Sequence, residues 1–372
     1  MKQRIILLGD RKNTEFEKIL WKNFAVEQQK DVNIAKENVS YYIIMEENIP
    51  MSTMKREKLL NIGIPADKIL EYCHFIKNPN KSGIELFQAE RVYNAYNGLW
   101  FGMSHSFAGL HEEMLRKQKI YKFSAPSMDL FYHYQVLKRL EKIYDFQKVK
   151  NIYFELPYYC FNYDVSMCPD IFMQRINFFY FFQEYHHFAE TEKGMCQIYN
   201  FETLNQLTDN TFYKTCLGTV RSVRNSATAY YLDRLKKNVY YVLQNKRRHK
   251  WTDEERKKIS QLRPHVWYKK HEKTVEENRA IWKKILELIQ KYERINVRVI
   301  VFPFCPYFIN SHGTIIDEKR REFMENIALP SNKVMDMFDY FGNRPELFDD
   351  ECHLNYLGAY LFSKRMNSML KE

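Results

Sequence analysis

Short and almost continuously apolar runs alternate with amphipathic stretches along much of this chain, and this alternation constrains the fold more than any other feature. The earliest runs are residues 4–9 and 41–45, and a stretch with helical periodicity follows each of them. Strands that are apolar along their whole length are typical of parallel sheets with helices on both faces. The sequence therefore predicts an α/β protein.

The first part of the alternation predicts a small N-terminal α/β domain over residues 1–76. Its expected strands and helices follow one another in the order β-α-β-α-β, at residues 4–9, 15–23, 41–45, 51–63 and 69–72. The turn after the first strand lacks the Gly-x-Gly-x-x-Gly fingerprint of dinucleotide-binding proteins. The polar stretch that follows, at 77–94, is rich in turn-forming residues at its start and is interpreted as a linker.

A second α/β series predicts a larger domain over residues 95–372. The expected strands lie at 99–101, 120–123, 152–156 and 297–302, and the expected helices at 109–117, 128–144, 274–292, 317–327 and 356–370. Residues from about 160 to 273 are rich in aromatic residues and helix formers but show no clear strand. We interpret this stretch as a helical insertion in the second domain.

The positive charge of the chain is concentrated in one segment. The formal net charge is +11, and residues 221–273 hold 16 Lys plus Arg against 5 Asp plus Glu, so the rest of the chain is balanced. Within it, residues 246–251 place cations next to a tryptophan, as grooves for nucleic acids do. A solvated helix face explains the cluster equally well, as does a surface for an anionic glycan or lipid head groups.

Several classes of protein are excluded by the absence of their signatures. No apolar run approaches the roughly 18 residues that a membrane-spanning helix needs, and the apolar run near Met1 is too short for a signal peptide. The seven cysteines are scattered, and none form a Cys-x-x-Cys pair. We therefore expect a cytoplasmic protein with reduced thiols and no membrane span.

Ser104 is the first candidate for a chemical role. Ligands of an open parallel sheet bind beyond the carboxyl ends of its strands, and Ser104 follows the expected strand 99–101 by three residues. A serine in such a turn is placed as a nucleophile would be, with backbone N–H groups close by. The alternative is an ordinary serine cap at the start of a helix.

Asp350 and His353 form the second candidate, immediately before the expected last helix. A spacing of three residues lets a carboxylate hold one nitrogen of the imidazole, which leaves the other nitrogen to take a proton from a serine. The neighbouring Asp349 is less well spaced for this contact. The alternative is that the histidine and the acidic residues only cap the final helix.

Taken together, the two candidates resemble the SGNH (GDSL-like) hydrolases. Gly102-Met103-Ser104 is similar to the first block of that family, with Met103 where Asp is usual, and the run from Asp350 through His353 to Asn355 is similar to its closing block. The resemblance covers residues 95–372. It implies a three-layer sandwich around a parallel sheet and a Ser-His-Asp triad of Ser104, His353 and Asp350. It also implies an esterase or O-acyltransferase, as found in bacterial surface-polysaccharide clusters.

The resemblance also suggests which groups would stabilise an oxyanion. The backbone N–H of Ser127 takes the place of the family's glycine, and the hydroxyl of Tyr158, or else Asn162, takes the place of its asparagine. Such chemistry implies no cofactor and no metal, and an acylated carbohydrate or small ester as substrate. The rival interpretation is a catalytically silent module of the same fold that binds an anionic polymer through residues 221–273.

Overall fold

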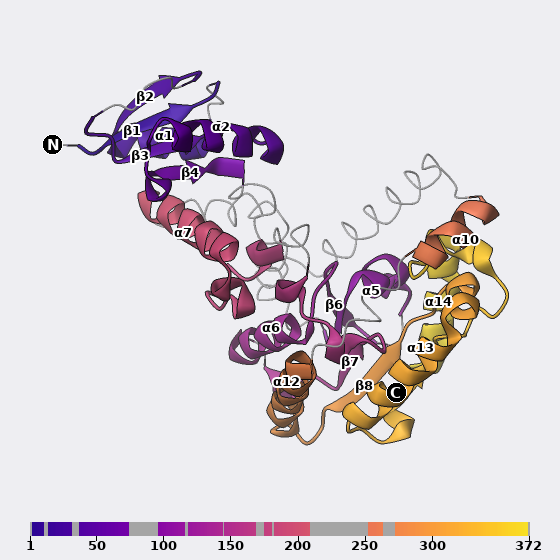
Figure 1. Cartoon of the computed structure of the whole chain (residues 1–372). Coiled ribbons are helices and arrows are strands. Elements are labelled where there is room, and N and C mark those ends of the chain that lie inside the picture. The colour runs from indigo at the N-terminus through magenta and orange to yellow at the C-terminus, as the bar shows by residue number, and fades with distance from the viewer. Residues whose placement is uncertain are drawn as a thin grey trace. The chain divides into compact units, whose positions relative to one another are not determined.

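The computed structural model divides the chain into two compact units (Figure 1). The first unit consists of Met1–Ile84 and Ser166–Ser222, and the second of Glu85–Val165 and Val223–Glu372. The structure describes residues 2–10, 14–31, 37–73, 96–115, 118–143, 145–168, 175–180, 182–208, 252–262 and 272–370. The expected linker at 77–94 lies outside these residues, as does the basic run at 246–251.

The first unit contains a four-stranded parallel sheet in the order β2-β1-β3-β4. Its strands are β1 (Arg4–Leu8), β2 (Ala25–Gln29), β3 (Tyr41–Ile44) and β4 (Ile69–Glu71), and its helices are α1 (Glu15–Asn23), α2 (Ile49–Asn61) and α7 (Glu192–Leu207). Short 3-10 turns lie at Ala66–Lys68 and His186–Glu190. Strand β2 was not expected from the sequence. It is a partly exposed edge strand, so it carries no continuous apolar run that could reveal it.

Helix α7 belongs to this first unit because it is bonded to the edge strand β4. The side chain of Asn200 accepts a hydrogen bond from the N–H of Glu71 at 2.6 Å and donates to the carbonyl of the same residue at 3.1 Å. The amide thereby pairs with the strand edge as a further strand would. Residues 166–222 therefore group with the N-terminal sheet, whereas the sequence suggested an insertion in the second domain.

The second unit contains a five-stranded parallel sheet in the order β6-β5-β7-β8-β9. Its strands are β5 (Gly98–Gly102), β6 (Ile120–Ser124), β7 (Asn151–Glu155), β8 (Asn296–Val301) and β9 (Val334–Asp336). Counted along the chain, this order is 2-1-3-4-5, in which the direction of winding reverses between β5 and β7. Strand β9 was not expected, because three partly exposed residues at a sheet edge leave no periodic signal.

Helices cover both faces of this sheet. They are α5 (Ser104–Gly109), α6 (Leu130–Ile143), α10 (Asp253–Leu262), α12 (Glu272–Gln290), α13 (Pro306–Asn326) and α14 (Tyr356–Met369), with 3-10 turns at Glu112–Met114, Phe146–Lys148, Cys160–Asn162 and Pro345–Leu347. A further 3-10 turn spans Val165–Met167, and another Ser331–Lys333. The prediction of a helix at 109–117 is wrong, because the helix here is α5, which begins at Ser104 soon after the strand and ends at Gly109.

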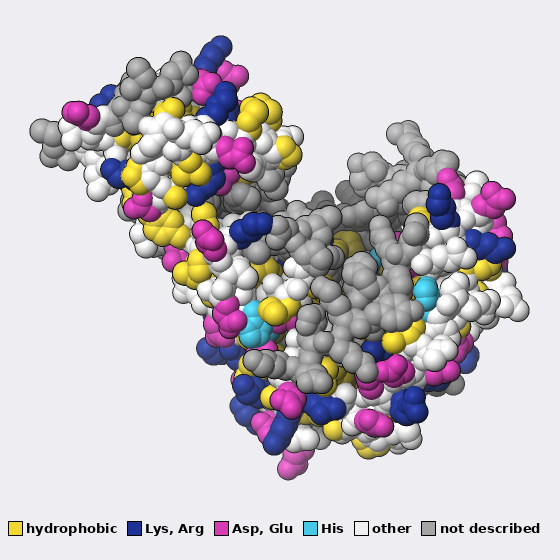
Figure 2. Space-filling view, in the orientation of Figure 1, with side chains coloured by type: hydrophobic (Ala, Val, Ile, Leu, Met, Phe, Trp, Pro, Cys, Tyr) yellow, Lys and Arg dark blue, Asp and Glu magenta, His cyan; other side chains and the backbone are white. Residues whose placement is uncertain are grey.

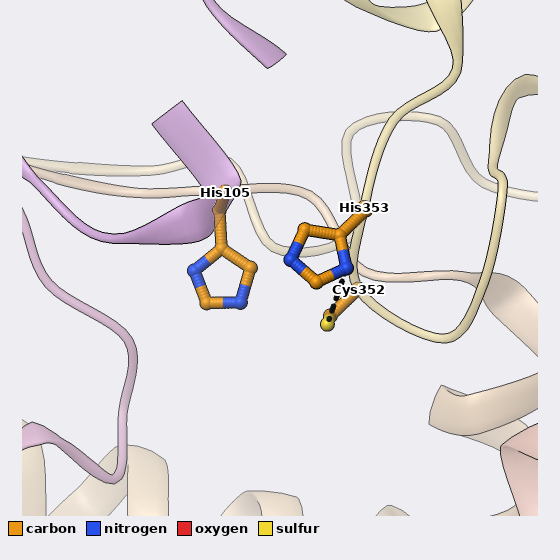
Figure 3. A group of neighbouring side chains, drawn as sticks. All are labelled: His105, Cys352 and His353. Atoms are coloured by element: carbon orange, nitrogen blue, oxygen red, sulfur yellow. Dashed lines mark hydrogen bonds between the residues drawn. The ribbon is translucent and has the colours of Figure 1, made fainter. Parts of the chain in front are cut away.

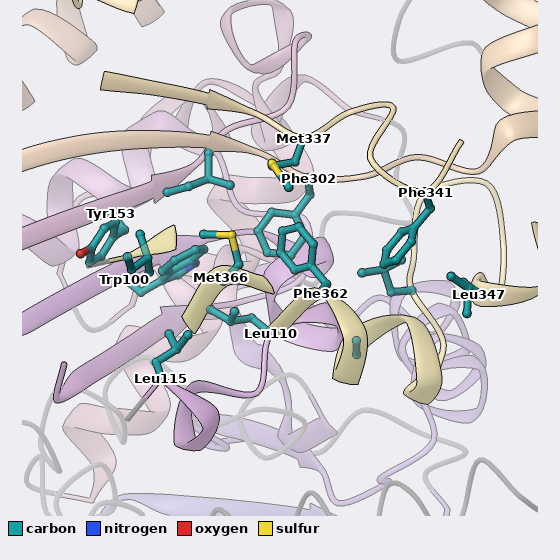
Figure 4. Packing of buried hydrophobic residues seen from close by; sticks show 14 of the residues in the cluster. Trp100, Leu110, Leu115, Tyr153, Phe302, Met337, Phe341, Leu347, Phe362 and Met366 are labelled. Atoms are coloured by element: carbon teal, nitrogen blue, oxygen red, sulfur yellow. The ribbon is translucent and has the colours of Figure 1, made fainter. Parts of the chain in front are cut away.

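Large side chains fill the space between the sheet and the helices on each face. On one face, Phe154 of β7 packs against Trp282 of α12, with ring centroids 5.1 Å apart. On the other face, Phe302 lies between Trp100 of β5 and Phe362 of α14 (Figure 4). Because α14 supplies much of this second layer, the loop that precedes it is fixed against the end of the sheet.

The described surface carries charges of both signs. Figure 2 shows acidic and basic side chains intermixed on the visible face of each unit. Of the basic segment 221–273, the structure describes helix α10 and the first residues of α12. Helix α10 has three acidic residues in its first turn, Asp253, Glu254 and Glu255. Within the described residues, no helix has the length and apolar character that crossing a bilayer requires.

Candidate functional site

The candidate site lies where the winding of the second sheet reverses, at the carboxyl ends of β5 and β7. Doubly wound sheets bind their ligands at this place, because the loops from the two strands part there and leave a crevice. The β5–α5 turn, residues 102–106, supplies one side of the site. Glu155, the last residue of β7, lies beside that turn and is wholly buried.

The carboxylate of Glu155 organises the β5–α5 turn. One oxygen accepts hydrogen bonds from the backbone N–H of Met103 and, at 3.0 Å, from the hydroxyl of Ser106. The other oxygen lies 2.9 Å from Nδ1 of His105. A buried carboxylate needs such partners, because an unpaired charge in the interior is strongly unfavourable. One side chain thus holds three residues of the turn, Met103, His105 and Ser106.

Gly102 makes this arrangement possible. A Cβ atom at this position would lie 1.9 Å from Oγ of Ser106 and 2.8 Å from Oε2 of Glu155. Both distances are far below van der Waals contact, so a larger residue would push the carboxylate away from the turn. The glycine that closes β5 is therefore required by the close approach of Glu155.

The far end of α5 is held by a buried lysine. Nζ of Lys122, on β6, donates a hydrogen bond to the carbonyl of Leu110 at 2.5 Å and lies 2.9 Å from the carboxylate of Glu112. A cation at the carbonyl end of a helix is well placed, and the carboxylate balances its charge. Both ends of α5 are therefore fixed by charged groups inside the protein.

The second side of the site is a closed loop of residues 348–355, which we call the histidine loop. Phe348 and Leu354 form an isolated antiparallel bridge, and the N–H of Asp349 donates to the carbonyl of His353 at 2.9 Å. Asn355 caps α14, because its side-chain oxygen accepts a hydrogen bond from the N–H of Gly358 at 3.1 Å. The side-chain amide of Asn355 donates to the backbone carbonyl of Glu346. The loop is thereby tied to the first turn of the helix.

Within the histidine loop, Asp350 holds His353 as the spacing of the two residues predicts. Nδ1 of His353 lies 2.7 Å and 2.9 Å from the two carboxylate oxygens of Asp350. One of these oxygens also accepts the backbone N–H groups of Cys352 and His353, at 2.9 Å and 2.8 Å. The carboxylate fixes the imidazole and the loop backbone together.

This contact changes the pKa of both groups. Burial by itself raises the pKa of Asp350, but the hydrogen bonds from the ring and the two amides outweigh it and lower the pKa to about 2. Burial by itself lowers the pKa of His353, but the bond to Asp350 and the negative charge outweigh it and raise the pKa above 6.5. The side chain of His353 is 29% exposed.

The two sides of the site meet through their histidines. The rings of His105 and His353 stack with centroids 5.5 Å apart and planes 26° apart. Figure 3 shows His353 between His105 and Cys352, with Sγ of Cys352 3.5 Å from Nδ1 of His353. A nitrogen of each ring and this sulfur all lie within 4.8 Å of one another.

Ser104 is the first residue of α5 and is partly exposed. Its hydroxyl makes no hydrogen bond within the described residues, so the direct bond to His353 that a triad requires is not formed in this structure. The reason is geometric: neighbouring side chains on a helix point about 100° apart, and it is His105 that faces His353. Catalytic hydrogen bonds of this kind often form only when a substrate is bound.

Two of the residues suggested for the oxyanion, Ser127 and Tyr158, have different surroundings. Ser127 lies in the turn after β6 with φ at 60°, and within the described residues its N–H donates no hydrogen bond. Tyr158 is buried, and its hydroxyl donates to Asp336 at 2.7 Å. Burial and that carboxylate raise the pKa of Tyr158. Its single proton is thus engaged away from the site, and Tyr158 has no part in our proposal below.

Three residues of the site were not recognised in the sequence: His105, Glu155 and Cys352. A signal exists for Glu155, because it is the only acidic residue in the otherwise apolar β7 strand and ends it. His105 stands next to Ser104, and no spacing in the sequence singles it out. Cys352 is one of seven scattered cysteines, and its partly exposed place in the histidine loop follows only from the fold.

The arrangement offers a serine, two carboxylate-bound imidazoles and a thiol at the carboxyl ends of β5 and β7. An imidazole held by a carboxylate through Nδ1 presents Nε2 as a base or as a ligand. Chemistry that fits is therefore proton transfer to or from a bound molecule, or coordination of an ion. Neither a scan of protein-family models nor a search of curated proteins finds a match for this chain.

Proposed function

We propose that the chain is a serine-dependent ester hydrolase or O-acyltransferase that acts through Ser104, His353 and Asp350. The observation that carries the proposal is the hydrogen-bonded Asp350–His353 pair, held on a closed loop beside the turn that contains Ser104. The strand order 2-1-3-4-5 with helices on both faces agrees with the three-layer sandwich that the SGNH resemblance implies. The site also lies where that order predicts a ligand.

In the proposed reaction, Nε2 of His353 takes the proton of Ser104 as the Ser104 oxygen attacks the carbonyl carbon of an ester. Asp350 keeps the remaining proton on Nδ1 and stabilises the imidazolium that forms. The ring then gives the proton to the departing alkoxide, which leaves an acyl group on Ser104. Water or a sugar hydroxyl takes over the acyl group in the second half of the reaction.

Charge on the carbonyl oxygen would be stabilised by backbone N–H groups. The donors in the proposal are the N–H groups of Ser104 and Ser127, because within the described residues neither has an acceptor. Loss of one such donor typically costs about 10²–10³ in rate. Without Tyr158, Asn162 is the side-chain donor that remains of the two that the resemblance suggests, and it is buried in the 3-10 turn Cys160–Asn162.

The substrate class is part of the same proposal. An acylated carbohydrate, a cytoplasmic location and a role in the synthesis of bacterial surface polysaccharide are what the resemblance implies. The rival function, binding of an anionic polymer through residues 221–273, falls mostly on residues outside the described ranges. No structural observation favours it.

The test is covalent labelling with a fluorophosphonate, followed by peptide mapping. Labelling is expected at Ser104, with none in Ser104→Ala, and the map distinguishes Ser104 from the nearby Ser106, whose hydroxyl is already bonded to Glu155. Asp350→Asn is expected to lower turnover of an aryl acetate by about 10⁴, as in serine proteases. Asp349→Asn is the matched control and is expected to have little effect.

Two results would contradict the proposal. A folded protein that takes up no label would favour the silent module, and so would label found equally in Ser104→Ala. Circular dichroism of each variant shows whether the fold is retained. Equal losses of turnover in the two aspartate variants would mean that Asp350 has no special part in the reaction.

A further inference from the structure

We propose that His105, Cys352 and His353 form a three-ligand zinc site beside the carboxyl end of β5. The cluster combines two imidazoles and one thiol whose ligand atoms all lie within 4.8 Å of one another. The residues come from two separate segments, the β5–α5 turn and the histidine loop, whose side chains lie side by side here (Figure 3). The proposal concerns binding of an ion and does not depend on the acyl-transfer reaction.

Each imidazole is prepared for an ion by a carboxylate. Glu155 holds Nδ1 of His105 at 2.9 Å, and Asp350 holds Nδ1 of His353 at 2.7 Å. With its proton on Nδ1, each ring keeps the lone pair on Nε2. This carboxylate–histidine arrangement is the usual outer shell of metal-binding histidines, and its loss typically weakens binding about 10- to 100-fold. Here it occurs twice, on rings that stack on each other.

The distances between the ligand atoms need only a small adjustment. Zinc binds nitrogen at about 2.0–2.1 Å and sulfur at about 2.3 Å, so tetrahedral ligands lie about 3.3–3.6 Å apart. Ligand atoms within 4.8 Å of one another must therefore close by at most about 1.5 Å. Sγ of Cys352 lies 3.5 Å from Nδ1 of His353, the nitrogen that Asp350 holds, so binding on Nε2 requires the partly exposed side chain of Cys352 to rotate toward that nitrogen.

The donor set selects the ion. Two imidazole nitrogens and a thiolate suit zinc, whereas magnesium and calcium bind oxygen ligands. The thiol of Cys352 releases its proton to solvent as the ion binds. Three protein ligands leave a fourth position open to water. The buried charge of Glu155 and the charge of Asp350 offset the positive charge of the ion.

Zinc binding and acyl transfer would exclude each other. An ion on Nε2 of His353 occupies the lone pair that has to accept the proton of Ser104. Within the proposed function, the site is therefore a means by which zinc silences the base. This consequence rests on the proposed function, but the binding itself does not.

The experiment measures zinc affinity on metal-stripped, full-length protein without an affinity tag, by competition with a chromogenic chelator. One equivalent of zinc is expected to bind, and Cys352→Ser and Glu155→Gln are each expected to weaken this binding by a factor of about 10–100 or more. Cys196→Ser is the matched control, because Cys196 is a partly buried thiol of the first unit. Its affinity is expected to equal that of the wild type.

Cobalt in place of zinc provides an independent readout. A thiolate-to-cobalt charge-transfer band is expected in the wild type and in Cys196→Ser but not in Cys352→Ser. Equal zinc affinity in the wild type, Cys352→Ser and Glu155→Gln would overturn the proposal, as would no binding by the wild type. If zinc binds as expected but leaves fluorophosphonate labelling of Ser104 unchanged, the zinc site stands and the inference that zinc silences His353 is refuted, whereas a lack of labelling in metal-free protein would count against the acyl-transfer function alone.

Discussion

Removal of the Glu155 carboxylate tests whether this single side chain holds the β5–α5 turn. In Glu155→Ala, the N–H groups of Met103 and of the His105 ring lose their acceptor inside the protein, while Ser106 keeps its contact with Ser124 at 2.8 Å. Each buried donor without an acceptor costs about 1–3 kcal/mol. Allowing for partial relaxation, we expect the second unit to lose about 3–5 kcal/mol of its free energy of unfolding.

Glu155→Gln is the matched variant. Its amide oxygen can still accept from Met103 and its amide N–H can donate to Nδ1 of His105, so the geometry is kept and only the charge is lost. We expect a cost of about 1 kcal/mol. The proton of His105 then moves to Nε2, which is why this variant also serves in the zinc experiment.

The assay is urea denaturation, with hydrogen exchange of peptides from β5 and β7 to assign the loss to the second unit. Trp100 and Trp282 are both buried in that unit and report on its unfolding by fluorescence. If Glu155→Ala costs no more than Glu155→Gln, the turn is held by other contacts and the reasoning above is refuted.

Two further predictions concern pH and close packing. In metal-free protein, the lowered pKa of Asp350 contributes stability that is present above pH 3.8 and is lost as the pH falls through about 2. The raised pKa of His353 contributes stability that is present below pH 6.5 and is lost as the pH rises through its higher folded value. The stability difference between the wild type and Asp350→Asn, measured by urea denaturation, should therefore be largest between pH 4 and 6.5, and a difference that keeps growing above pH 7 would contradict this. Gly358→Ala places a Cβ 2.3 Å from a backbone oxygen and should lower the free energy of unfolding by about 1–3 kcal/mol. Gly313→Ala, with nothing within 4 Å of the new Cβ, should be neutral or stabilise its helix by up to about 1 kcal/mol. Thermal melting of the two variants compares these effects. Equal melting temperatures for the two variants would show that the start of α14 has room to move.

The sequence predicted those elements whose burial leaves a pattern. Strands β1, β3, β4, β5, β6, β7 and β8 were expected because each is largely apolar, and the Asp350–His353 contact was expected because it depends only on local spacing. Edge strands β2 and β9 were missed, since one side of each faces solvent. The assignment of α7 to the first unit depends on Asn200, whose amide pairs with a strand far away in the sequence.

The candidate site shows the same limit. His105, Glu155 and His353 are brought together by the sheet and are separated by 50 and 198 positions in the sequence. No local sequence pattern predicts that Glu155 accepts hydrogen bonds from the turn after β5. Nor does one predict that His105, rather than Ser104, faces His353. These contacts follow from strand register and from the direction in which α5 starts.

The second unit is built from two stretches of the chain, Glu85–Val165 and Val223–Glu372, so its strands are not synthesised one directly after another. Strands β5, β6 and β7 emerge first, and β8, the strand that pairs with β7, begins 141 positions after Glu155. At about 5–20 residues per second, the ribosome needs roughly 7–30 s to reach it. During that interval the growing polypeptide presents an unpaired β7 edge, while Ser166–Ser222 joins the other unit. Substitutions in β7 should therefore reduce the yield of expressed protein first through aggregation during translation, before they affect the stability of the folded protein.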